Sequence, residues 1–66
     1  MEINMKYEKI YSQIIERAKY RVLEGYKETH HITPRCMGGA DEKDNLVDLT
    51  AREHFICHLL LTRIHP

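Results

Sequence analysis

Pro34 and the pair Gly38-Gly39 interrupt regular secondary structure near the middle of the chain. Because proline disfavours helical backbone at the preceding residue, the extended segment 26–32 is predicted to end there. Glycines and turn-forming residues fill 35–45, which is predicted to be a loop. The apolar run Leu46–Leu49 is consistent with a second strand. If the two short strands pair, they form a hairpin around this loop.

A helix is predicted on each side of the hairpin. The first covers residues 5–24, where apolar residues recur at three- and four-residue steps, and Gly25 suits the turn that ends it. The stripe consists of Tyr7, Ile10, Tyr11, Ile14, Ile15, Ala18 and Val22. The second helix is predicted to start at Ala51, because Thr50 and Glu53 match a capping box. This order predicts one small α+β domain, in which a helical segment (residues 1–25) packs on a core formed by residues 26–66.

A chain of 66 residues buries only about 60% of its unfolded surface, so its own core is marginal. Domains of this size often add a disulfide, a metal ion or a partner chain. The 5 histidines make a metal ion the more plausible addition, since neutral imidazole is a common ligand. A homodimer through the apolar stripe of helix 5–24 is left open, because that stripe can pack inward or against a second copy.

The cysteine and charge content limits the cellular setting and the mode of binding. The 2 cysteines, without a signal peptide or an apolar run of about 20 residues, point to a reducing cytoplasm and no membrane span. Lys and Arg number 10 and Asp and Glu number 10, so the chain lacks the basic excess that grips nucleic acid by charge alone.

The histidines form two pairs with different spacing. His54 and His58 lie at i and i+4 on one face of the second helix, where they can bind one metal ion or be ordinary surface histidines. His30 and His31 are neighbours on a strand and therefore point to opposite faces. If the hairpin brings one of them to the helix, three ligands with open positions result, a pattern typical of catalytic metal sites. The other histidine is then free to act as a general base.

These motifs together resemble the HNH nucleases, whose fold is a ββα-metal finger. The matching residues are Glu28-x-His30-His31-Ile-x-Pro34, Gly38-Gly39, Asn45-Leu46-Val47 and Glu53-His54-x3-His58. The whole chain also resembles a phage-encoded HNH subgroup, through Glu24-Gly25-Tyr26 and the run 49–58. Members of that subgroup continue further, so the chain is expected to be a truncated or minimal version acting in a phage-infected bacterial host.

The resemblance implies a role for each matching residue. His31 would be the general base, and His30, His54 and His58 the metal ligands. Asn45 would pin the hairpin and so help to aim the base, and Glu28 would have a supporting role.

The resemblance also implies DNA as the substrate, cut by phosphodiester hydrolysis to a 5′-phosphate and a 3′-hydroxyl. Arg35 and Arg52 could contact phosphates, or could simply be solvated. An all-histidine shell leaves the divalent ion open among zinc, nickel, manganese and magnesium. Two alternatives compete with the enzyme: a non-catalytic metal module that binds nucleic acid or protein, and a truncated nuclease too short to hold DNA.

Overall fold

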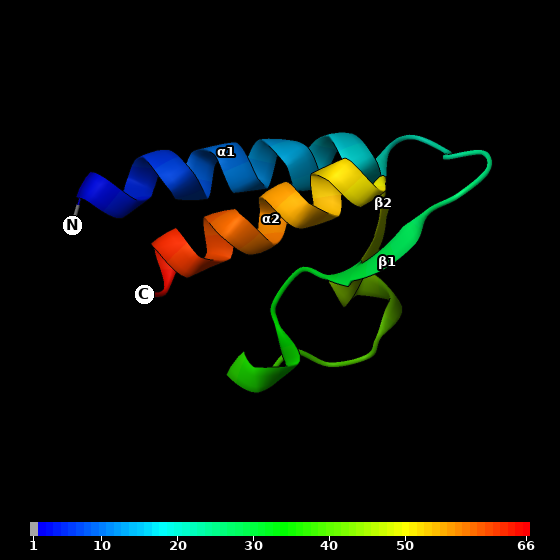
Figure 1. The fold of residues 1–66 in the computed structure, drawn as a ribbon. Helices are drawn as coiled ribbons and strands as arrows, with labels where there is room; N and C mark the ends of the chain where they lie inside the picture. The colour runs from blue at the N-terminus through cyan, green and yellow to red at the C-terminus, as the bar shows by residue number, and fades with distance from the viewer. Residues whose placement is uncertain (1) are drawn as a thin grey trace.

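The computed structural model describes the backbone of residues 2–66 and the side chains of residues 5–66. Helix α1 (Glu2–Lys19) comes first, strands β1 (Glu28–His31) and β2 (Leu46–Leu49) follow, and helix α2 (Ala51–Ile64) closes the fold. The predicted α+β order is confirmed, and Figure 1 shows the hairpin at one end of the two helices. The loop between the strands contains two short 3₁₀ turns. They are η1 (Arg35–Met37) and η2 (Lys43–Asn45).

The two strands form an antiparallel hairpin, as predicted. Glu28 lies opposite Leu49, and His30 lies opposite Val47. Since alternate residues of a strand share a face, Glu28 and His30 lie on the same face of β1. His31 lies on the other face, opposite Leu46. The hairpin therefore separates the two neighbouring histidines, as their spacing predicted.

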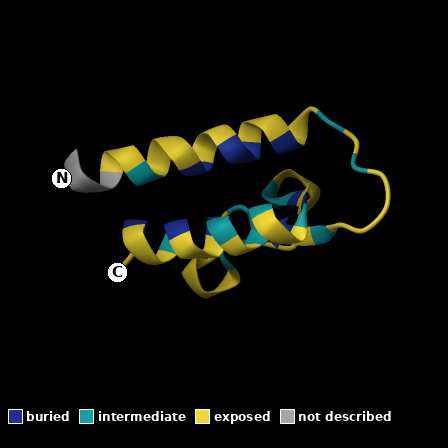
Figure 2. Cartoon of the chain, turned by 45° about the horizontal axis from the view of Figure 1, so that its top comes forward, coloured by how far each residue is buried: buried dark blue, intermediate teal, exposed yellow. Residues whose placement is uncertain are grey.

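The core lies where the two helices meet the hairpin. The helices run antiparallel and side by side, and Figure 2 shows their buried faces turned toward each other. The buried apolar residues are Tyr11, Ile14, Ile15, Ala18, Val47, Leu49, Cys57, Leu60 and Ile64. The apolar stripe of α1 thus packs inward over most of its length, and it rests on both α2 and β2.

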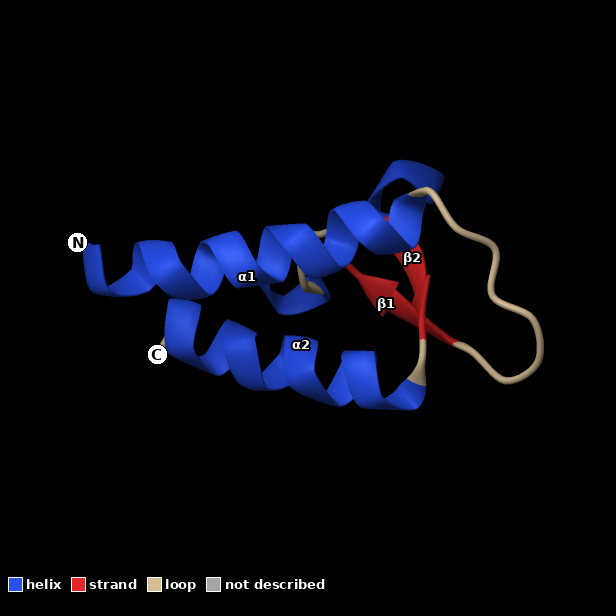
Figure 3. Cartoon of the chain, turned by 90° about the horizontal axis from the view of Figure 1, so that it is seen from above, coloured by secondary structure: helices blue, strands red, loops and turns tan. Residues whose placement is uncertain are grey.

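The predicted end of the first helix is wrong. Helix α1 ends at Lys19 rather than at residue 24, and Val22 is 88% exposed instead of continuing the stripe. A loop, tan in Figure 3, carries the chain from α1 to β1. In that loop Arg21 forms a two-pronged ion pair with Glu53 on α2, with a distance of 2.8 Å from Nη1 to Oε2. This tertiary contact takes the place of a further helical turn.

The start of α2 is confirmed at Ala51. The Thr50 hydroxyl accepts from the Glu53 backbone N–H at 3.1 Å, and the Glu53 carboxylate accepts from the Thr50 N–H at 3.0 Å. Arg21 first, and then these Thr50 contacts, lower the pKa of Glu53 to about 2. The capping box fixes the first turn of α2, and so the positions of His54 and His58. Among the residues described, neither helix is long and apolar enough to cross a membrane.

Candidate metal centre

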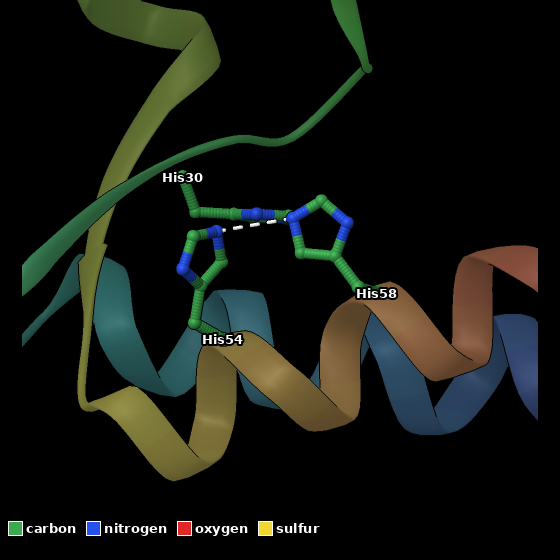
Figure 4. Close-up of side chains that lie close together, drawn as sticks. All are labelled: His30, His54 and His58. Carbon is green, nitrogen blue, oxygen red and sulfur yellow. Dashed lines mark hydrogen bonds between the residues drawn. The ribbon is translucent and has the colours of Figure 1, made fainter.

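Three histidines converge between β1 and α2. His30 comes from the strand, and His54 and His58 come from successive turns of the helix, as Figure 4 shows. Each offers one ring nitrogen, and the three nitrogens lie within 4.8 Å of one another. The ring centroids are 4.7 Å apart for His54 and His58, and 5.1 and 5.4 Å apart for the pairs that include His30. The structure thus brings together the three residues that the sequence predicted as ligands.

His30 is the buried member of the cluster, with 2% of its surface exposed. Its Nε2 lies 2.7 Å from the Tyr11 hydroxyl, which also lies 2.7 Å from the carbonyl oxygen of Ile32. A carbonyl can only accept, so the phenol donates its single hydrogen to Ile32 and accepts from the His30 Nε2–H. This assignment leaves Nδ1 as the His30 atom with a free lone pair.

His54 is oriented in the same way by a carboxylate. Its Nδ1 lies 2.6 Å from Glu28 Oε1, an acceptor, so Nδ1 carries the hydrogen and Nε2 is free. The Nε2 atoms of His54 and His58 are 3.1 Å apart. Two nitrogens on one tetrahedral zinc ion, each about 2.0–2.1 Å from it, would be about 3.3 Å apart. The helical pair therefore needs little adjustment to share an ion.

The electrostatic environment keeps His30 neutral. Burial, followed by the imidazoles of His54, His58 and His31, lowers the pKa of His30 to about 4. Only neutral imidazole has a lone pair for a metal ion, so His30 is ready to bind one at neutral pH. Glu28 contacts the far ring nitrogen of His54, and a carboxylate at that place is a usual feature of histidines that bind a metal ion. The donor set fits a divalent ion that accepts nitrogen ligands.

His31 lies outside the cluster, but it lines the same cavity as His30, His54 and His58. Its Nε2 lies 2.6 Å from Asp41 Oδ1. Asp41 also receives two hydrogen bonds from Arg35, at 3.1 Å from Nε and at 2.7 Å from Nη2. Arg35 first, and His31 next, lower the pKa of Asp41 to about 2. The cavity has a volume of about 250 Å³, and its lining consists of Thr29, His30, His31, Pro34, Arg35, His54, His58 and Leu61.

Asn45 connects the two ends of the loop. Its Oδ1 accepts from the Thr33 N–H at 2.8 Å, and its Nδ2 donates to the carbonyls of Thr33 at 3.1 Å and Ala40 at 2.8 Å. Gly39 lies directly against this connection, because a Cβ there would be 1.8 Å from the Thr33 oxygen and 2.9 Å from Asn45 Nδ2. The loop that follows the histidine doublet is thus held by Asn45 and needs glycine at position 39.

The remaining candidate residues lie apart from the cluster. Arg52 is exposed on α2 and does not line the cavity, whereas Arg35 does. His65 is exposed beyond the end of α2. Cys57 is fully buried, and burial raises the pKa of its thiol to about 11, as befits a core residue. Cys36 is exposed, and both thiols are free.

Two residues of the site were missed by sequence reasoning. Tyr11 was assigned only to the apolar stripe, although a buried tyrosine needs a hydrogen-bond partner for its hydroxyl. Asp41 was assigned only to turn formation, and it contacts His31, which lies ten positions earlier in the chain. The tyrosine could have been suspected from its chemistry, whereas nothing in the local sequence marks Asp41.

The comparisons with known proteins point to phage endonucleases. Probable mobile endonuclease E of Enterobacteria phage T4 is 64% identical over 63 residues, which cover 94% of this chain and 45% of that protein. Probable mobile endonucleases D and B of the same phage are each 53% identical over 66 residues, covering 26% and 25% of those proteins. The chain is similar to phage proteins named as endonucleases.

The likeness covers only a portion of each relative. The chain spans less than half the length of the curated relatives it matches. No family model matches the sequence, and no solved structure matches the fold. The assignment of roles to individual residues therefore depends on the geometry of the site.

Proposed function

We propose that the chain is the nuclease core of a metal-dependent DNA endonuclease of the HNH type. The observation that carries the proposal is the division of the histidine doublet, with His30 inside a three-histidine cluster and His31 outside it at the same cavity. A purely structural metal site has no use for a histidine at that place. The names of the relatives support cleavage of nucleic acid by an endonuclease.

In this proposal His31 is the general base. It lines the cavity and is not a member of the cluster, so a ring nitrogen remains available to take a proton from a water molecule. That water would attack the phosphorus of a phosphodiester. A positioned general base contributes about 10²–10⁴-fold to a rate.

His30, His54 and His58 would hold one divalent ion, with Tyr11 and Glu28 fixing the ring orientations of two of them. When bound, such an ion stabilises the negative charge that develops on the phosphate oxygens and on the leaving group. The identity of the ion stays open among zinc, nickel, manganese and magnesium. Asn45 would help to aim His31 by fixing the loop that follows it.

The proposed substrate is DNA, and the proposed setting is a bacterium infected by a phage. Arg35 lines the cavity and is the arginine better placed to meet a phosphate. Arg52 would contact DNA only outside the cavity. With equal numbers of basic and acidic residues, tight binding of DNA would depend on the bound ion and on local contacts.

The test is plasmid cleavage by the wild-type chain and by His31→Ala, each with magnesium, manganese, nickel or zinc and with metal content measured in parallel. We expect His31→Ala to lose about 10²–10⁴-fold in rate while it keeps its metal and its fold. His65→Ala, a histidine substitution away from the cavity, is the matched control and should cut like the wild type.

The alternative is a non-catalytic or truncated module that holds a metal ion and binds nucleic acid. That function would be indicated if the wild type and His31→Ala both bind metal and neither cuts DNA with any of the four ions. Equal cleavage by both proteins would instead support the nuclease function and show that His31 is not its general base.

A further inference from the structure

Asp41 lies behind the proposed base and touches it directly. On the basis of the proposed function, we infer that Asp41 is a positioning residue, which fixes the His31 imidazole in the tautomer and orientation that a general base needs. Asp41 Oδ1 lies 2.6 Å from His31 Nε2. The HNH resemblance assigns no role to position 41.

The contact selects one tautomer of His31. An ionised carboxylate can only accept hydrogen bonds, so the hydrogen of a neutral His31 ring lies on Nε2. Nδ1 is then the nitrogen with a free lone pair and the one that can accept a proton. Without the carboxylate, the hydrogen can occupy either nitrogen, and a fraction of the molecules would lack a base at the right atom.

Arg35 holds the carboxylate in place. Its Nε donates to Asp41 Oδ1 at 3.1 Å, and its Nη2 donates to Oδ2 at 2.7 Å. This paired geometry restrains the plane of the carboxylate as well as its position. Arg35, Asp41 and His31 thus form a chain of side chains that ends at the proposed base.

The position of Asp41 distinguishes a positioning role from direct contact with a substrate and from simple support of the loop. His31 and Arg35 line the cavity but Asp41 does not, so Asp41 acts through His31 rather than on a substrate. The loop is already held by the Asn45 amide, which binds backbone groups of Thr33 and Ala40. Asp41 instead contacts the side chains of His31 and Arg35. A residue that only supported the loop backbone would not need these contacts.

The kinetic test compares Asp41→Asn with the wild type in steady-state cleavage of a DNA duplex. We expect kcat to fall by about 10- to 100-fold, a fraction of the full contribution of a general base. KM should stay unchanged or fall, because the substitution removes a negative charge beside the DNA. A merely structural role would instead raise KM and lower metal content together with kcat.

Asp44→Asn is the matched control, since it removes the same charge from the same loop but lies at a different cavity, beside Lys19 and Val47, whereas Asp41 contacts His31. It should retain the wild-type kcat. A result in which Asp41→Asn and Asp44→Asn behave alike would overturn the inference.

A spectroscopic test does not depend on activity. Two-bond ¹H–¹⁵N spectra of the zinc-loaded chain at about pH 8, above the ordinary imidazole pKa, distinguish the protonated ring nitrogen from the bare one. We expect His31 to carry its hydrogen on Nε2 in the wild type and to lose that preference in Asp41→Ala. An unchanged tautomer in Asp41→Ala would contradict the inference.

The outcomes separate this inference from the function on which it rests. If the wild type fails to cut DNA with every one of the four ions, the proposed function is refuted, and with it any role of Asp41 in the reaction. A wild type that cuts, together with an Asp41→Asn variant that cuts equally well, refutes the role of Asp41 alone.

Discussion

Tyr11 has two roles, because its ring lies in the core and its hydroxyl lies at the histidine cluster. The ring belongs to the buried face of α1, and the hydroxyl joins His30 to the Ile32 carbonyl. Burial raises the pKa of this phenol, so it stays protonated at neutral pH. A residue of α1 thus determines which nitrogen of His30 is free, although α1 supplies none of the three clustered histidines.

Replacing Tyr11 by phenylalanine separates these roles. The ring and its packing remain, but the acceptor for the His30 Nε2–H is lost, and His30 can then turn or change tautomer. We expect zinc affinity to fall by about 10- to 100-fold, the usual effect of losing an outer partner of a ligating histidine. Titration against a competing chromogenic chelator measures this.

Tyr7→Phe is the control for Tyr11→Phe, because Tyr7 is a partly buried tyrosine one turn earlier on α1. It should bind zinc like the wild type. Equal affinities for Tyr11→Phe and Tyr7→Phe would show that the Tyr11 hydroxyl does not orient the ligand.

Among the elements, the loop between the strands has tightly packed backbone at Gly39. Gly38 adopts a φ of 89° at the end of η1, and Gly39 then passes against the backbone of Thr33. The Asn45 amide forms hydrogen bonds with the N–H and the carbonyl of the same Thr33. We call the point where Gly39 passes the Thr33 backbone the crossing. Since His31 lies two residues before Thr33, a displacement of the crossing would move the proposed base.

Gly39→Ala should therefore reduce both stability and cleavage. A Cβ at 1.8 Å from the Thr33 oxygen forces the backbone apart, and overpacking of this kind costs about 1–3 kcal/mol. Chemical denaturation and the plasmid assay measure the two effects.

Gly25→Ala is the comparison for Gly39→Ala. Gly25 has a φ of 85°, and no atom lies within 4 Å of the place that a Cβ would occupy, so alanine there meets backbone strain but no clash. It should lose about 1–2 kcal/mol and keep full cleavage. If both variants cut normally, the crossing at Gly39 does not position the site.

The distance over which a contact acts determines what could be predicted from the sequence. The start of α2 was predictable because Thr50 and Glu53 are close in sequence and cap each other. The cluster was only partly predictable, since helical spacing alone aligns His54 with His58. The end of α1 and the role of Asp41 were not, because they depend on the contacts of Arg21 with Glu53 and of Asp41 with His31.

At the scale of the whole molecule, the histidine cluster joins elements that otherwise share a small core. His30 belongs to the hairpin, and the other two proposed ligands belong to α2. A ligand that binds only the folded state stabilises it by RT ln(1 + [L]/Kd), about 2.7 kcal/mol when the ligand is present at 100 times its Kd. For a domain of this size, such an ion would contribute about as much as one fully buried core side chain, which is worth about 1.5–3 kcal/mol.

We expect saturating zinc to raise the melting temperature by about 10–20 °C over the chelator-treated protein, given about 4–8 °C per kcal/mol for small domains. Thermal unfolding followed by circular dichroism measures the shift. His54→Ala should lose the zinc-dependent rise, and His65→Ala should keep it. A rise that survives in His54→Ala would place the stabilising ion elsewhere.

The two thiols have a practical consequence for studying the proposed reaction. Cys36 is exposed on η1, next to Arg35 of the cavity lining, while Cys57 is buried and its raised pKa keeps the reactive thiolate scarce. A maleimide fluorophore would therefore attach at one place without any engineered cysteine. The wild-type chain carries its own attachment point for a reporter at the edge of the site, where the approach of DNA would change the emission.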